Sequence, residues 1–170
     1  MAFVIRDARP EEFEPLGRLM VAVYSGLDGF PKPEEQPKYY EMLAHIGLMT
    51  AKPGTRLLVA EAGGRLLGGV VYFADMAQYG SGGTATQEKH AAGFRLLAVD
   101  PATRGAGVGR ALAQACVDLA REAGLGQMII HTTQSMRVAW GMYEKMGFRR
   151  SQDLDFMQGQ LQVFGFRLPL

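Results

Sequence analysis

The sequence that decides the fold is Phe94-Arg-Leu-Leu-Ala-Val-Asp-Pro-Ala-Thr-Arg-Gly-Ala-Gly-Val-Gly-Arg-Ala-Leu112. A hydrophobic strand runs into a turn with three glycines, and the turn leads directly into a helix. The backbone N–H groups of such a turn can converge on an anion, and the N-terminus of the helix adds a partial positive charge. Arg104 and Arg110 flank the glycines and can add full charges. The stretch therefore predicts a phosphate-binding turn.

Two common nucleotide-binding motifs do not fit this turn. A dinucleotide-binding fingerprint that starts at Gly105 and Gly107 needs a third glycine at the position held by Arg110. The phosphate-binding loop of nucleotide hydrolases needs a Gly-Lys-Ser/Thr sequence, and the chain contains no Gly-Lys pair. An ordinary glycine-rich turn without a ligand stays open as the alternative.

The other elements follow from hydrophobic periodicity and from turn residues. Gly63-Gly64 separates two apolar runs and predicts a hairpin, because a two-residue primed turn needs positive φ angles. Gly124 follows an apolar helical stripe as its C-cap. We expect a first helix that opens at residues 10–13 and further helices at about 34–49, 109–123 and 136–146. Loops are expected at 25–37 and at 76–90, the second of them mobile. The expected strands cover 3–7, 56–61, 65–74, 91–99, 127–133, 148–156 and 160–168.

These elements occur in the order β-α-α-β-β-β-α-β-α-β-β. The strand–helix–strand unit over residues 96–133 predicts a parallel pair of strands with a right-handed crossover. A length of 170 residues fits one domain, and no composition shift or repeat divides the chain. We therefore expect a single domain over residues 1–170, of the α/β class, with helices layered on one sheet.

The composition is that of an ordinary globular protein, with 48% hydrophobic and 21% charged residues. A formal net charge of +1 gives no electrostatic reason to expect a nucleic-acid or membrane partner. Cys116 is the only cysteine, and we expect it in the core of a helix, without a disulfide. The N-terminus lacks the pattern of a signal peptide, and the longest apolar stretch, residues 66–74, is far shorter than the ~20 residues of a spanning helix. We expect a soluble cytoplasmic protein.

Two motifs of this chain resemble those of the GNAT superfamily of acetyltransferases. The family signature Gln/Arg-x-x-Gly-x-Gly/Ala stands here as Arg104-Gly-Ala-Gly-Val-Gly109, and Leu97-Ala-Val-Asp-Pro101 before it is also typical. A second family pattern, Ala-x-x-x-Tyr-Glu-Lys-x-Gly-Phe, stands as Ala139-Trp-Gly-Met-Tyr-Glu-Lys-Met-Gly-Phe148. The resemblance is strong over residues 91–150 and extends before them only in element order. It implies the GNAT fold, a twisted, mostly antiparallel mixed sheet of about seven strands with one parallel pair and four helices.

The resemblance implies acetyl-CoA as a co-substrate, and a role for each matching residue. Main-chain groups of Leu97 and Val99 would pair with the pantetheine arm like an added strand, and an N–H of Leu97 or Ala98 would face the thioester oxygen. Tyr143 would protonate the departing CoA thiolate, since a phenol with an ordinary pKa near ~10 is neutral at pH 7. The pyrophosphate would be held by Arg104, Gly105, Ala106, Gly107, Val108, Gly109 and Arg110.

Some residues depart from the family pattern or have a simpler explanation. Met136 stands where many members carry asparagine, and Gly93 stands where many carry a glutamate that acts as a base through water. The general base is therefore unassigned, with Asp75, Glu88, His90 and His131 as candidates by chemistry alone. Tyr143 shares a helical face with Met136, Ala139 and Trp140 and is alternatively a core residue. No cysteine–histidine cluster has the spacing of metal ligands, so we expect no metal.

The leading hypothesis is an acetyl-CoA-dependent N-acetyltransferase that acetylates a primary amine of a small molecule by direct attack. A protein or peptide N-acetyltransferase and a non-catalytic acyl-CoA-binding or sensing domain remain alternatives. The acceptor would lie among residues 24–40, 75–90 and 153–159, which carry charges of both signs and several aromatic side chains. They do not identify the amine, and the sequence also leaves open whether the chain forms a homodimer.

Overall fold

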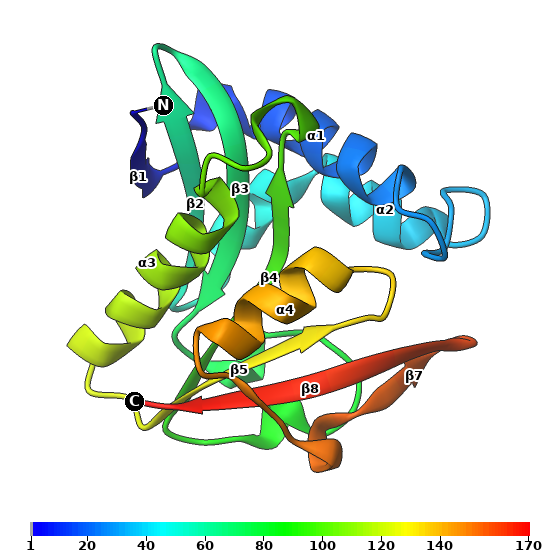
Figure 1. Ribbon diagram of the computed structural model, residues 1–170, viewed down its shortest axis with the longest axis vertical. Helices are drawn as coiled ribbons and strands as arrows, with labels where there is room; N and C mark the ends of the chain where they lie inside the picture. Colours follow the sequence, from blue (N-terminus) through cyan, green and yellow to red (C-terminus); the bar gives the residue numbers. More distant parts are fainter. Residues whose placement is uncertain (1) are drawn as a thin grey trace.

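The computed structural model describes residues 2–170, whose strands form one mixed sheet with helices on both faces (Figure 1). Neighbouring strands follow the order β1-β2-β3-β4-β5-β8-β6, and β7 pairs with β8. Among the described residues, β4 and β5 form the parallel pair, and the other pairs are antiparallel. The strands are β1 (Val4–Asp7), β2 (Thr55–Ala62), β3 (Arg65–Phe73), β4 (Ala91–Val99), β5 (Gln127–Thr132), β6 (Arg149–Arg150), β7 (Phe156–Gln158) and β8 (Leu161–Pro169).

Two hydrophobic cores lie on opposite faces of this sheet, because successive strand side chains point to opposite sides. Leu57 and Val59 of β2 join the core under α1 and α2, whereas Leu58 and Ala60 join the core under α3 and α4. The α-helices are α1 (Phe13–Ser25), α2 (Pro37–Ala44), α3 (Val108–Glu122) and α4 (Arg137–Lys145). The expected mixed sheet with one parallel pair and helices layered on it is confirmed.

Strand β4 reverses the direction of its side chains at Leu96. Ala92 and Phe94 point into the core under α3 and α4, but Leu96 and Ala98 point into the core under α1 and α2. Leu96 has a φ angle of +62°, and the register between β3 and β4 shifts at the same place. Because an extra residue in one strand inverts the alternation that follows it, this is a β-bulge.

The parallel pairing of β4 with β5 ends just before the bulge. Ala91, Ala92 and Gly93 of β4 pair with β5, and no later residue of β4 does so within residues 2–170. Strand β5 continues to Thr132 in register with β8 instead. The two parallel strands therefore diverge, and the main-chain edge of β4 after Gly93 is not paired with β5.

The second helix is shorter than the sequence predicts. α2 begins at Pro37 and ends at Ala44, and a 3-10 helix covers Ile46–Ala51. The end of α2 packs directly on the backbone of α1: a Cβ atom on Gly17 would lie only 2.2 Å from the carbonyl oxygen of Ala44. The loop expected at residues 76–90 also contains two 3-10 helices, Met76–Gln78 and Ala85–Gln87.

The expected strand over residues 148–156 is interrupted. β6 stops at Arg150, a 3-10 turn follows, and the fully buried Leu154 packs on Gly165 of β8, where a Cβ atom would lie 2.2 Å from that of Leu154. Arg150 forms a two-pronged ion pair with Asp155 across the interruption, at 2.7 Å and 2.8 Å. The packing of Leu154 on Gly165 joins the interruption to another strand, β8, and such a contact between elements is not visible in the periodicity of residues 148–156.

Candidate active site

The glycine-rich turn has the backbone that its sequence predicts. Gly105 and Gly107 have φ angles of +85° and +81°, which side-chain-bearing residues rarely adopt. A Cβ atom at either position would meet no atom within 4 Å. Glycine is therefore required here by the backbone conformation, and the space in front of the turn is open.

The first amide groups of α3 have no hydrogen-bond acceptor within the helix. Gly107 is the N-cap residue and no side chain caps the helix. The first bond back to the cap runs from Ala111 N to Gly107 O at 3.0 Å, so the amides of Val108, Gly109 and Arg110 have no helical acceptor. With the positive end of the helix dipole, they form a ready site for an anion.

The open edge of β4 presents the amides of alternate residues. Asp100 N donates to Leu67 O of β3 at 2.8 Å, so the amide of Asp100 points toward β3. Because amide directions alternate along a strand, that of Ala98 also points toward β3, while those of Leu97 and Val99 point toward the gap. Of the two expected thioester-facing amides, Leu97 has the suitable direction. Its carbonyl accepts a hydrogen bond from Tyr24 Oη at 2.9 Å.

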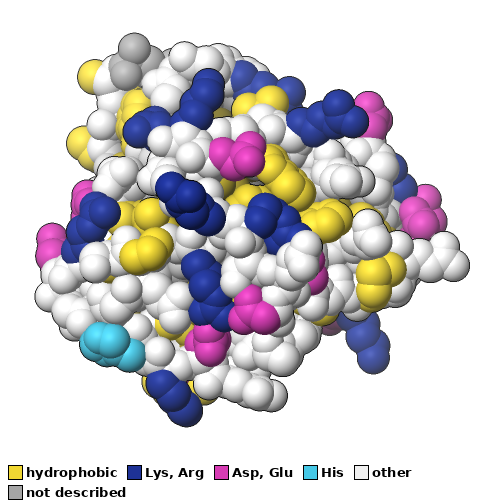
Figure 2. Space-filling model, turned by 60° about the horizontal axis from the view of Figure 1, so that its bottom comes forward, with side chains coloured by type: hydrophobic (Ala, Val, Ile, Leu, Met, Phe, Trp, Pro, Cys, Tyr) yellow, Lys and Arg dark blue, Asp and Glu magenta, His cyan; other side chains and the backbone are white. Residues whose placement is uncertain are grey.

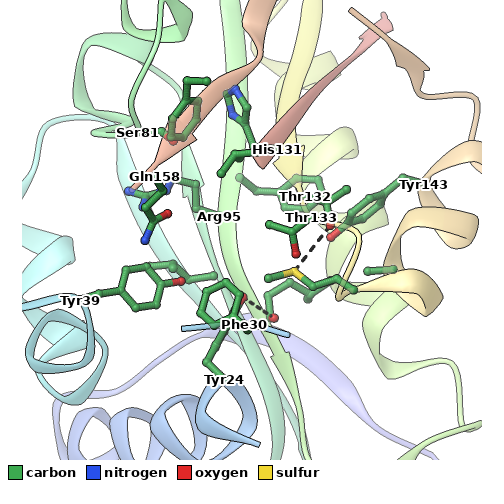
Figure 3. A pocket seen from close by; sticks show the side chains of 17 residues that line it. Tyr24, Phe30, Tyr39, Ser81, Arg95, His131, Thr132, Thr133, Tyr143 and Gln158 are labelled. Carbon is green, nitrogen blue, oxygen red and sulfur yellow. Dashed lines mark hydrogen bonds between the residues drawn. The ribbon is translucent and has the colours of Figure 1, made fainter. Parts of the chain in front are cut away.

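Tyr143 of α4 faces the same gap from the opposite side. Its side chain is 4% exposed and contacts Phe94 and Phe148 edge-on, with ring centroids 5.7 Å and 5.8 Å away. No hydrogen bond joins its hydroxyl to the residues drawn around the cavity, where Thr132 instead donates to Met136 Sδ at 3.6 Å (Figure 3). Burial raises the pKa of Tyr143 above the ordinary 10.0, which keeps the phenol protonated.

A cavity of about 100 Å³ fills the gap between the diverging strands. Tyr143, Thr132 and Thr133 line one side of it, and Arg95, Gln158 and Tyr39 line the other (Figure 3). Aromatic rings close its base, with Tyr24, Phe30 and Tyr39 in mutual contact at centroid distances of 5.5–6.1 Å. The open edge of β4 and Tyr143 thus border one cavity. The turn before α3 meets the end of β4 at Gly109, where a Cβ atom would lie 3.4 Å from the side chain of Val99.

Comparison with known proteins identifies the family. The family model for the acetyltransferase (GNAT) family matches residues 20–148. The chain belongs to the acetyltransferase (GNAT) family. A mycothiol acetyltransferase from Streptosporangium roseum is 40% identical over 62 residues, which are 36% of this chain and only 18% of that protein.

Solved structures of GNAT proteins share the fold over nearly the whole chain. An N-acetyltransferase from Thermoplasma acidophilum, in complex with coenzyme A, has a TM-score of 0.74 at 16% identity and covers 97% of this chain and 98% of that chain. A putative acetyltransferase from Salmonella typhimurium with its cofactor acetyl-CoA has a TM-score of 0.68 at 18% identity, covering 100% and 95%. At such identities the likeness shows the fold.

None of the four candidate bases is a free group at the cavity. The Glu88 carboxylate is paired with Arg167, and Asp75 accepts from the amide of Ala77 at 3.0 Å. His90 is exposed and does not line the cavity. His131 does line it, but both of its ring nitrogens are hydrogen-bonded within the fold.

The hydrogen bonds of His131 fix its tautomer. Its Nε2 lies 2.9 Å from the carbonyl oxygen of Leu154, which can only accept, so Nε2 carries the proton. Its Nδ1 therefore accepts from the Tyr79 hydroxyl, also at 2.9 Å. Burial lowers the pKa of His131 below its ordinary value, which favours this neutral form.

Tyr79 also occupies the space where many GNAT proteins have their glutamate. A Cβ atom on Gly93 would lie 2.7 Å from the ring of Tyr79 and 2.8 Å from the carbonyl oxygen of Ile129. A glutamate at position 93 therefore does not fit in this fold. The sequence analysis placed Tyr79 in an acceptor segment but did not predict its contact with Gly93. The signal that could have revealed this contact is a glycine on β4 together with a buried tyrosine in the preceding loop.

Three further features of the described residues concern metal binding, membrane-spanning helices and surface charge. No cluster of three or more His, Cys, Asp or Glu side chains within residues 2–170 can hold a metal ion. No helix in the same part of the chain is long and apolar enough to cross a membrane. On the face seen in Figure 2, Lys and Arg side chains are interspersed with Asp and Glu.

Proposed function

We propose that this GNAT protein transfers an acetyl group from acetyl-CoA to a primary amine of a small molecule, by direct attack. The observation that carries the proposal is the unpaired edge of β4, which lies between the free amides at the start of α3 and the unbonded hydroxyl of Tyr143. Acetyl-CoA is a substrate here, and each of its parts has a partner in this arrangement.

The α3 turn would bind the pyrophosphate. The amides of Gly105, Gly107, Val108, Gly109 and Arg110 would supply donors, and the exposed guanidinium groups of Arg104 and Arg110 would supply charge. The amide of Ala106 already donates to Thr103 O at 3.3 Å. The amides of Leu97 and Val99 would pair with the pantetheine arm as an added strand does, and the Leu97 amide would donate to the thioester oxygen as negative charge develops on it.

Tyr143 would act as the general acid. The amine nitrogen forms a bond to the carbonyl carbon of the thioester, and the carbon–sulfur bond then breaks. The phenol proton of Tyr143 moves to the departing sulfur, and the proton lost by the nitrogen returns to the phenolate through water, so the enzyme is regenerated. The raised pKa of Tyr143 keeps this proton available at neutral pH.

The size of the cavity favours a small acceptor over a peptide. Its volume of about 100 Å³ is well below the ~300–1,000 Å³ of pockets for drug-sized ligands. The segment before α2 and the β7–β8 hairpin also meet beside it, because Gln158 Nε2 donates to Gln36 Oε1. A protein or peptide acceptor and a non-catalytic acyl-CoA-binding domain are the competing functions.

Release of free CoA thiol from acetyl-CoA, measured across amines, amino acids and peptides with free N-termini, tests the proposal. We expect turnover with at least one small amine and little with peptides. Turnover with peptides alone would favour the protein acetyltransferase. Micromolar binding of acetyl-CoA without turnover of any amine would favour the non-catalytic domain.

A further inference from the structure

Arg95 is a partly buried cation on the acceptor side of the cavity, and no carboxylate pairs with it among the described residues. It lines the cavity from β4, one residue before the bulge. Its Nη1 donates to the carbonyl oxygen of Tyr79 at 2.8 Å, and its guanidinium lies 5.7 Å from the centroid of the Tyr79 ring. A guanidinium has five N–H donors, so most of those of Arg95 remain for a ligand.

The acidic side chains near the cavity are already paired with other arginines. Glu88 and Asp153 both bind Arg167, and Asp155 binds Arg150. No aspartate or glutamate lines the cavity itself within residues 2–170. The acceptor side therefore carries a positive charge that the protein does not neutralise.

A second cation approaches the same place. A Cβ atom built on Gly80 would lie 3.5 Å from Lys52 Nζ and 3.6 Å from Arg95 Nη1. Lys52 Nζ also lies 3.4 Å from the carbonyl oxygen of Gln78 and makes no ion pair within the described chain. Two like charges near one loop, without a counter-charge, favour binding of an anion.

Capping of the 3-10 helix Met76–Gln78 is the simpler explanation for these cations. Contacts with the carbonyls of Gln78 and Tyr79 do complete the end of that helix. Capping accounts for one donor of Arg95, but it does not require the rest of a planar, two-pronged donor to line a cavity. Arginine is the side chain whose geometry matches a carboxylate at two points.

We propose that the acceptor is an amino acid, whose carboxylate is bound by Arg95 while its amine faces the Leu97 amide and the thioester. This rests on the proposed acetyl transfer and names its substrate class. Arg95 and Leu97 are two residues apart on β4, so one strand supplies both the carboxylate anchor and the thioester-facing amide. The rings of Phe30, Tyr39 and Phe156 offer an apolar surface for the side chain of the amino acid.

Matched acceptors separate the carboxylate from the rest of the molecule. L-phenylalanine and L-leucine are compared with 2-phenylethylamine and 3-methylbutylamine, which lack only the carboxylate, by measuring kcat/KM for thiol release. In the parent protein we expect the carboxylated acceptors to be used better. Arg95→Gln should lower kcat/KM for them by about 10- to 100-fold, as loss of hydrogen bonds to a charged group does, and change that for the decarboxylated amines less than about threefold.

Comparing each acceptor between parent and variant cancels the different basicities of the amines. Arg95→Lys, which keeps the charge but not the planar fork, should restore part of the preference. Arg121→Gln is the matched control, because it removes an exposed arginine at the far end of α3 and should leave kcat/KM for both classes unchanged. Melting temperatures and acetyl-CoA affinities of all variants show whether the fold and the cofactor site are intact.

Each outcome decides a separate claim. Equal losses for both classes in a folded Arg95→Gln protein would make Arg95 structural and overturn the inference. Better use of the decarboxylated amines by the parent protein would overturn it as well, while leaving acetyl transfer intact. Absence of thiol release from every acceptor would overturn the proposed function itself.

Discussion

At the scale of single residues, two buried tyrosines near the cavity have different surroundings. The Tyr79 hydroxyl is bonded to His131, whereas the Tyr143 hydroxyl is bonded to none of the residues around the cavity. Burial raises the pKa of both, so both are neutral phenols at physiological pH. A group whose proton is committed to a neighbour stabilises the fold, and a group whose hydroxyl is free is available for chemistry.

Removal of the Tyr143 hydroxyl is therefore expected to lower activity, whereas removal of the Tyr79 hydroxyl is expected to lower stability. Tyr143→Phe should lower kcat by at least about tenfold, because general acid catalysis is worth ~10²–10⁴-fold and water replaces it only in part. Its melting temperature should stay near that of the parent, because the ring keeps its contacts with Phe94 and Phe148. Steady-state kinetics at saturating acetyl-CoA, where chemistry limits the rate, measures the loss.

Tyr79→Phe is the matched control for that experiment. Loss of its bond to His131 should cost about 0.5–1.5 kcal/mol of stability and several degrees of melting temperature, with kcat of the folded protein nearly unchanged. An unchanged kcat in a folded Tyr143→Phe protein would assign Tyr143 to the core and remove it from the mechanism.

The glycine turn permits an equally direct test of the pyrophosphate site. Gly107→Asp should abolish measurable binding of acetyl-CoA, which we expect near micromolar affinity, or about −8 kcal/mol, in the parent. Gly107→Asn has nearly the same shape and tolerates the φ of +81° equally well, but carries no charge. Calorimetry should therefore show much weaker binding for the aspartate than for the asparagine variant. Equal affinities of both variants and the parent would place the cofactor elsewhere.

At the scale of elements, the sequence predicts what is decided locally. The bounds of α3 and α4 agree with their predicted ranges within one residue, because glycines and apolar stripes mark them. The bulge at Leu96 is not predicted, since leucine has no preference for a φ of +62°. Its conformation depends on partners in other elements, among them Tyr24 of α1, which binds the next carbonyl. The sequence thus located the strand of the site but not the gap beside it.

The hydrogen bond from His131 of β5 to Leu154, in the interruption after β6, predicts that the stability of the fold depends on pH. His131 joins Tyr79 and Leu154, and burial lowers its pKa below the ordinary 6.5. The unfolded chain therefore binds a proton that the folded chain does not, so the contribution is complete above the ordinary pKa of 6.5 and is lost as the pH falls through the lower pKa of the folded state. Urea unfolding between pH 5 and 7.5 should show this decrease. His131→Gln should flatten it, while the exposed His45→Gln should not.

At the scale of the whole molecule, Glu88, Asp153 and Asp155 are paired with Arg167 and Arg150, and within the described residues no acidic side chain is paired with Arg95. The net charge of +1 indicated neither this nor the unpaired Arg95, because composition carries no information on which charges meet. Figure 2 shows the mixture of signs on one face. The phosphate turn and Tyr143 were found from two local motifs. The segments expected around the acceptor, residues 24–40, 75–90 and 153–159, each contribute to the lining of the cavity. Arg95 was not among the expected residues, because it comes from β4 and no local motif marks it.

This distribution predicts how the rate of acetyl transfer depends on pH. Without a free carboxylate at the cavity, the amine must arrive deprotonated, so kcat/KM should rise about tenfold per pH unit up to the pKa of the amine and then level off. Acceptors of different basicity should shift that limb by the difference in their own pKa values. Because the pKa of Tyr143 is raised above 10.0, no falling limb should appear below about pH 10. Asp75→Asn and Glu88→Gln should leave the profile in place; a fixed limb near pH ~4–5 that either one removes would instead identify a dedicated carboxylate base.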